Sequence, residues 1–150
     1  MPIHFHYVAE LNCLFTTGKG KVSRQAFLDY HRAIDITDPP ATLLVLSDYR
    51  ELDPSGLSSS DIEEIRTNAL GRTENKYQAV KEAIVVSETL TFGLSRMYDS
   101  VVYSEKYEVN VFTDMDEART WLGLEPESGT RGRAGRDDTD RTEGNPLPST

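Results

Sequence analysis

Cysteine, long apolar runs and basic charge are all scarce in this chain of 150 residues. The single cysteine, Cys13, cannot form an internal disulfide, which is typical of proteins of a reducing compartment. No apolar run approaches the length of a membrane span, and the first residues lack the basic segment followed by an apolar one that marks a signal peptide. We therefore predict a cytoplasmic protein that does not insert into a membrane.

Acidic residues outnumber basic ones by 25 to 16, which gives a net charge of −9. Binding to nucleic acid or to an anionic membrane surface requires a basic face, so the composition argues against both partners. His4 and His6 alternate with apolar residues and are expected to face solvent rather than to hold a metal. The sequence contains no convincing set of ligands, and we expect neither a metal nor another cofactor.

The last part of the chain has almost nothing to bury. Residues 125–150 contain one large apolar residue, Leu147, among charged residues, glycine, proline and serine. Such a composition favours disorder, because too little apolar surface is available to offset the entropy of ordering the chain. We predict one domain over residues 1–124, a length that supports a single core, followed by a polar tail over residues 125–150.

Alternating apolar residues and helix-capping signals divide the domain into strands and helices. The expected strands cover residues 3–8, 11–17, 42–47, 83–86 and 107–112. Helices are expected after the N-cap Ser23, after a capping box formed by Ser60 and Glu63, and between Asp114 and Gly123. Gly71 is expected to end the second of these helices. An apolar stripe over residues 90–101 predicts a further helix. In the final helix, Met115, Ala118, Trp121 and Leu122 are expected to face inward.

The order ββαβαβαβα predicts an α/β fold. Strands that alternate with helices form a mostly parallel sheet with right-handed crossovers. The first two strands, joined by a short turn, add one antiparallel pair. The expected architecture is therefore a mixed, mostly parallel five-stranded sheet with about four helices.

Three segments carry a resemblance to a known family. They are residues 14–18 with Val22 and Ser23, residues 43–57, and residues 107–123. In their order and spacing they resemble the STAS fold, and within it the SpoIIAA-like group of small STAS/SEC14-type proteins, over roughly residues 3–124. The likeness to anti-sigma-factor antagonists implies a non-enzymatic regulatory domain that binds a protein partner or a small anionic or apolar ligand. The sequence leaves open whether the chain forms a homodimer.

The resemblance also implies where contact would occur. In the antagonists an Asp-Ser-Ser-Gly turn presents a serine to a kinase, whereas this chain has Asp53-Pro54-Ser55-Gly56. Proline replaces the first serine and Ser55 is displaced by one residue, so we do not expect Ser55 to act as a phosphoswitch. The alternative is a simple turn with a proline corner. The residues that we predict to bind a ligand or partner are Asp48, Tyr49, Arg50, Asp53, Ser55 and Ser58.

The SEC14 branch of the resemblance implies a second function. A carrier of a small molecule or lipid would use a groove between helices, and such a protein needs an apolar cavity much larger than a packing defect. The apolar residues of the sequence suggest a core of ordinary size. We therefore expect binding at the loops after the central strands, and a carrier is the alternative.

Overall fold

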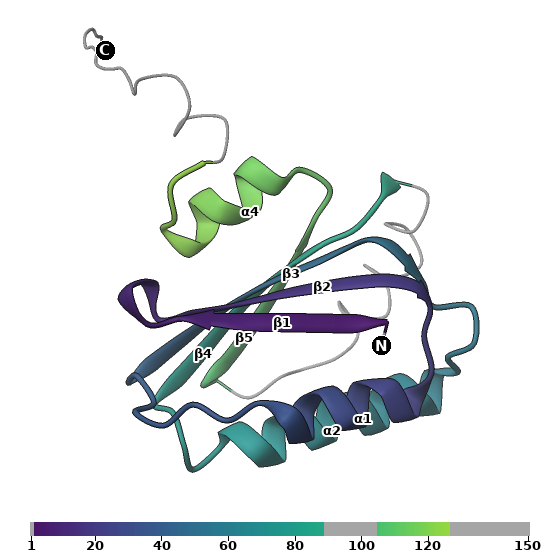
Figure 1. Ribbon diagram of the computed structural model, residues 1–150, viewed down its shortest axis with the longest axis horizontal. Coiled ribbons are helices and arrows are strands. Elements are labelled where there is room, and N and C mark those ends of the chain that lie inside the picture. The colour runs from purple at the N-terminus through teal and green to yellow at the C-terminus, as the bar shows by residue number, and fades with distance from the viewer. Residues whose placement is uncertain (1, 89–104, 127–150) are drawn as a thin grey trace, which may run out of the picture. The chain divides into compact units, whose positions relative to one another are not determined.

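The computed structural model describes residues 2–88 and 105–126 of the chain (Figure 1). The helix that we predict over residues 90–101, and most of the predicted polar tail, lie outside the described residues. The chain divides into two compact units, Met1–Thr113 and Asp114–Thr150. The strands are β1 Ile3–Val8, β2 Cys13–Lys21, β3 Thr42–Asp53, β4 Ala79–Val85 and β5 Tyr107–Phe112. The helices are a short 3₁₀ turn Ala9–Leu11, α1 Arg24–Ala33, α2 Ser59–Thr73 and α4 Met115–Leu122.

The five strands form one sheet in the order β1-β2-β3-β4-β5. β1 is antiparallel to β2, and every later neighbour is parallel. The predicted α/β class and the mostly parallel mixed sheet are thus confirmed. Because each parallel strand lies beside the preceding one and crossovers are right-handed, the connecting helices fall on one face of the sheet. Figure 1 shows α1 and α2 side by side on that face.

The core of the first unit lies between this face and the two helices. Side chains alternate along each strand, and the set that includes Leu14, Val45 and Ile84 is buried there against Phe27 and Tyr30 of α1. His4 and His6 have the opposite orientation on β1 and are exposed, as predicted. In the described part of the chain, no helix combines the length and the apolar character that crossing a membrane requires.

β3 is longer than the sequence pattern indicates. We predict its end at residue 47, but it continues to Asp53 alongside the second half of β2. The register between the two strands shifts between Thr17 and Lys19, and the backbone N–H of Val22 donates to the carbonyl of Asp53 at 3.1 Å. This bulge carries the pairing past the point where the apolar run ends. The segment that we expected to be a loop is therefore largely strand.

The start and end of α2 also differ from the prediction. The capping box is formed by Ser58 and Asp61, two residues earlier than expected: the Ser58 hydroxyl accepts from the Asp61 N–H at 3.1 Å, and the Asp61 carboxylate accepts from the Ser58 N–H at 2.9 Å. A turn closed by the Leu57 N–H and the Pro54 carbonyl, 2.9 Å apart, delivers the chain directly to this cap. At the other end the helix runs through Gly71 to Thr73, because glycine is tolerated within a helix.

The helix signals elsewhere are confirmed. Ser23 caps α1 by accepting from the Ala26 N–H at 3.1 Å. In the second unit, Asp114 caps α4 and Gly123 ends it with a left-handed φ of 81°. Of the four residues expected to face inward, Ala118 and Leu122 are buried, and Met115 and Trp121 are partly buried.

Candidate functional site

The first three residues of the predicted loop site have structural roles within β3. The Arg50 side chain donates to the Asp48 carboxylate through Nε at 2.9 Å and Nη2 at 2.8 Å. Partial burial alone would raise the pKa of Asp48, but the hydrogen bonds and charge of Arg50 lower it. Tyr49 has the opposite orientation and is buried, with its ring edge-on to Phe27. Asp48 and Arg50 thus form a surface ion pair, and Tyr49 belongs to the core.

The other three predicted residues shape the turn that leads to α2. The Asp53 carboxylate accepts from the Ser55 N–H at 3.0 Å, a hydrogen bond that lowers the pKa of Asp53. Ser55 is exposed, and Ser58 is the helix cap described above. These contacts explain the local sequence, and a binding role for the six residues remains a prediction.

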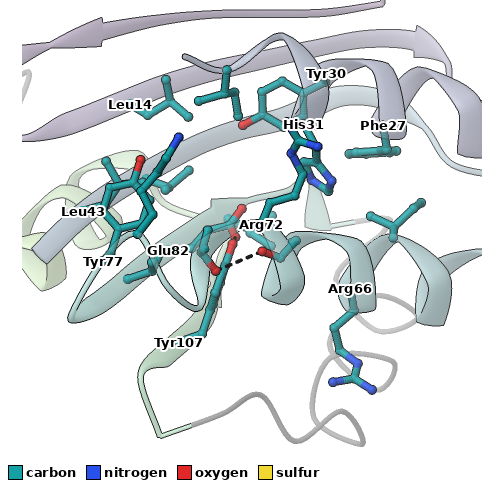
Figure 2. Close-up of a pocket in the computed structure, with 18 of the residues that line it drawn as sticks. Leu14, Phe27, Tyr30, His31, Leu43, Arg66, Arg72, Tyr77, Glu82 and Tyr107 are labelled. Carbon is teal, nitrogen blue, oxygen red and sulfur yellow. Dashed lines mark hydrogen bonds between the residues drawn. The ribbon is translucent and has the colours of Figure 1, made fainter. Parts of the chain in front are cut away.

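A cavity of about 260 Å³ lies instead between the sheet and the two helices of the first unit (Figure 2). It is larger than the engineered apolar cavity of about 150 Å³ that accommodates benzene. Of the six predicted residues only Tyr49 lines it. We call this space the helix–sheet cavity. Its apolar lining comes from three strands, α1 and α2: Leu14, Leu43, Val45, Val80, Ile84, Phe27, Ile34, Ile65 and Ala69.

One carboxyl group, that of Glu82, lines the cavity among the described residues. Glu82 lies on β4 between Val80 and Ile84 and shares their orientation toward the helices. It accepts hydrogen bonds from the Ser47 hydroxyl at 3.1 Å and from the Tyr107 hydroxyl at 2.8 Å. Burial raises the pKa of Glu82, against the opposing effect of these two hydrogen bonds.

A second polar pair lies beside the carboxyl group. The hydroxyls of Thr16 on β2 and Tyr30 on α1 are 2.7 Å apart, and both residues are buried. Burial, and to a lesser extent the negative charge of Glu82, raises the pKa of Tyr30 far above its ordinary value. Tyr30 therefore remains a neutral hydrogen-bonding group inside the cavity.

Basic side chains complete the lining from the helix side. His31 on α1 lies 2.9 Å from the Asn68 side-chain oxygen through Nδ1. Burial lowers the pKa of His31, and the nearby charge of Arg72 adds to this effect, against the hydrogen bond to Asn68. Arg66, Arg72 and Lys76 also line the cavity. Figure 2 shows that Arg66, which pairs with Glu63, points away from Glu82 and Tyr107.

Sequence reasoning missed this site for an identifiable reason. We predicted that this strand starts at residue 83, which left Glu82 outside it, whereas the strand begins at Ala79. The available signal was a single carboxylate between Val80 and Ile84 at the alternation of a strand. Read in that register, Glu82 is a charged residue at an inward-facing position, and such a residue is a candidate for function.

The pKa of Glu82 gives a prediction for stability. Because the folded-state pKa is raised, the folded protein holds a proton that the unfolded chain releases, so stability falls as the pH rises through this window. Glu82→Gln is neutral at every pH and should be more stable than the wild type at neutral pH, with the difference vanishing near pH ~4. Urea unfolding across this range measures it.

A matched variant separates this effect from a general change in charge. Glu108 on β5 is exposed, and Glu108→Gln removes the same charge outside the cavity. Its stability should follow that of the wild type at each pH. If the free energy of unfolding depends on pH in the same way for Glu82→Gln and the wild type, the Glu82 carboxyl group is not buried.

Within residues 2–88 and 105–126, no three histidine, cysteine, aspartate or glutamate side chains are grouped so that they could hold a metal ion. The helix–sheet cavity is lined by apolar side chains, hydroxyl groups, one carboxyl group and basic side chains. Comparison of the chain with family models, with curated proteins and with solved structures found no match.

Proposed function

We propose that this protein binds a small organic molecule in the helix–sheet cavity, and that it holds and releases this ligand without transforming it. The observation that carries the proposal is a largely apolar space of about 260 Å³ between the sheet and the helices. Protein interiors are close-packed and contain few voids larger than a water molecule. A space of this size far exceeds such a void and approaches the smaller ligand pockets, whose volumes begin at roughly 300 Å³.

The distribution of polar groups supports the same conclusion. Ligand sites are mainly apolar, with a small number of fixed polar groups that orient the bound molecule. Here the apolar walls surround Glu82, which is held by Ser47 and Tyr107, and Tyr30, which is paired with Thr16. These side chains come from separate elements and are ordered by each other, so they offer a preorganised hydrogen-bonding edge to a polar atom of the ligand.

The STAS-like assignment stays part of the proposal. It is supported by the sequence resemblance over roughly residues 3–124 and is compatible with the mostly parallel mixed sheet. Within that assignment we favour the carrier function over contact at the six residues predicted from the sequence, which lie in the second half of β3 and in the turn that follows it. The reason is that Asp48, Arg50 and Ser58 are engaged in local hydrogen bonds, whereas the cavity offers both space and polar groups.

Ala69 provides a test of the cavity. It lies on α2 and lines the space, so Ala69→Phe should fill part of it without removing any hydrogen bond. We expect the wild type to bind the neutral probe 2-naphthol saturably, with one molecule per chain, and Ala69→Phe to bind it at least about ten-fold more weakly. Isothermal titration calorimetry measures the affinities, and circular dichroism verifies that the variant is folded.

The matched control is Ala33→Phe, at an exposed position near the end of α1 outside the cavity. It should change the affinity by less than about two-fold. Mass spectrometry of the released 2-naphthol should recover it unchanged. The absence of saturable binding to the wild type, or full affinity in folded Ala69→Phe, would overturn the proposal.

A further inference from the structure

The charge that lines the helix–sheet cavity is opposite to that of the whole chain. The protein has a net charge of −9, yet Arg66, Arg72 and Lys76 line the cavity, and Glu82 is the one carboxylate among its described lining residues. Such a local reversal attracts an anion, because basic side chains beside low-dielectric walls concentrate the positive potential. The charge of the lining therefore indicates which kind of ligand the cavity binds, which its volume alone does not.

Two of the basic residues are available to a ligand. Arg66 forms an ion pair with Glu63, but in the described part of the chain neither Arg72 nor Lys76 forms one. Arg72 is close enough to His31 for its charge to act on that imidazole, and His31 itself lines the cavity. Figure 2 shows Arg72 beside His31.

The position of Arg72 and Lys76 near the end of α2 explains only in part why both are basic. A basic residue in the last turn of a helix is favoured by the helix dipole, and Arg72 occupies such a position on α2. Lys76 follows the end of α2, and both Arg72 and Lys76 are exposed to solvent. The dipole does not account for both side chains lining the same apolar space, and a bound anion does.

We infer that the ligand is an organic acid, with its anionic group held by Arg72 and Lys76 and its apolar body in the helix–sheet cavity. This inference rests on the proposed function. A guanidinium group recognises a carboxylate through two parallel hydrogen bonds, and the ammonium group of a lysine adds a second positive charge. Glu82 offers no positive charge to an anion, so the anionic group lies at the basic residues and the apolar part of the ligand extends toward Glu82.

The space available constrains the apolar body. The helix–sheet cavity exceeds the volume that accommodates one benzene ring. A neighbouring cavity of about 180 Å³ shares four of its lining residues, Thr73, Tyr77, Val80 and Tyr107. The body is therefore larger than a single ring, such as a fused bicyclic ring system or an alkyl chain, with room to continue past Tyr107.

A pair of probes that differ in charge tests the inference. The anion 2-naphthoate and the neutral 2-naphthol have the same ring system. At neutral pH and low salt, the wild type should bind 2-naphthoate at least about ten-fold more tightly than 2-naphthol. The double variant Arg72→Gln/Lys76→Gln should lose at least about ten-fold in affinity for 2-naphthoate and less than about two-fold for 2-naphthol.

The control variant has the same change in net charge, at positions outside the cavity. Lys21→Gln/Arg32→Gln also removes two positive charges, at exposed positions outside the cavity, and should leave both affinities within about two-fold. If 2-naphthol binds but 2-naphthoate binds no better, or the two double variants lose affinity equally, the inference is overturned and the proposed function stands. If neither probe binds, both are overturned.

Discussion

Tyr30→Phe should lower the free energy of unfolding by about 1–3 kcal/mol, although it removes a single oxygen atom. The Tyr30 hydroxyl lies 2.7 Å from that of Thr16, and these residues are only 5% and 1% exposed. Without the phenol oxygen, the Thr16 hydroxyl is left in an apolar setting and loses the partner that compensates for its removal from water. Urea denaturation measures the difference.

A double-mutant cycle identifies the cause. Thr16→Val alone should cost a similar amount, because it leaves the Tyr30 hydroxyl without this partner. The double variant Tyr30→Phe/Thr16→Val should cost clearly less than the sum, because replacing both members of a buried pair leaves no unsatisfied group. Thr17→Val, at an exposed position of the same strand, should change stability by less than about 0.5 kcal/mol. Strict additivity in the cycle would contradict the hydrogen bond.

Gly18→Ala should destabilise the fold by about 1–3 kcal/mol through overpacking. A methyl group at this position would lie 2.8 Å from Leu52 Cδ1 and 3.0 Å from Tyr49 Cδ1, and both of these side chains are buried. The Tyr49 ring is fixed by its contact with Phe27 and has little freedom to move away. A lower melting temperature in thermal denaturation is the expected result.

The opposite outcome is expected for Gly71→Ala. A methyl group there meets nothing within 4 Å, and the position lies within α2. Alanine favours the helix over glycine by up to about 1 kcal/mol, so this variant should be more stable than the wild type. If Gly18→Ala is as stable as the wild type, the close approach of β3 side chains to Gly18 is not present in solution.

The sequence predicted helix ends correctly where a single residue determines the position of the end. Ser23, Asp114 and Gly123 each act through their own side chain or backbone conformation, and each ends or begins a helix where expected. Prediction was less accurate where two equivalent signals competed. Ser58 and Ser60 are each followed three residues later by an acidic residue, and the turn at Pro54 decides in favour of Ser58.

Features that depend on pairing between distant segments could not be predicted in the same way. The extension of β3 depends on its pairing with the second half of β2, past the irregularity in register, and the sequence of β3 alone does not show this pairing. The helix–sheet cavity depends on how completely side chains from the strands, α1 and α2 fill the space between them. Apolar periodicity shows which face is buried, but it contains no information about the volume left between two buried faces.

The sequential order of the strands has a consequence for assembly. Each strand after β1 adds to the free edge of the strand that precedes it in the chain, so none has to insert between two strands already paired. The sheet can therefore grow in the direction of synthesis, with the β1–β2 hairpin as its start. The cavity lining extends from Leu14 on β2 to Tyr107 on β5 and is complete only when β5 has joined. A ligand bound there recognises the finished sheet and, by mass action, stabilises it as a whole.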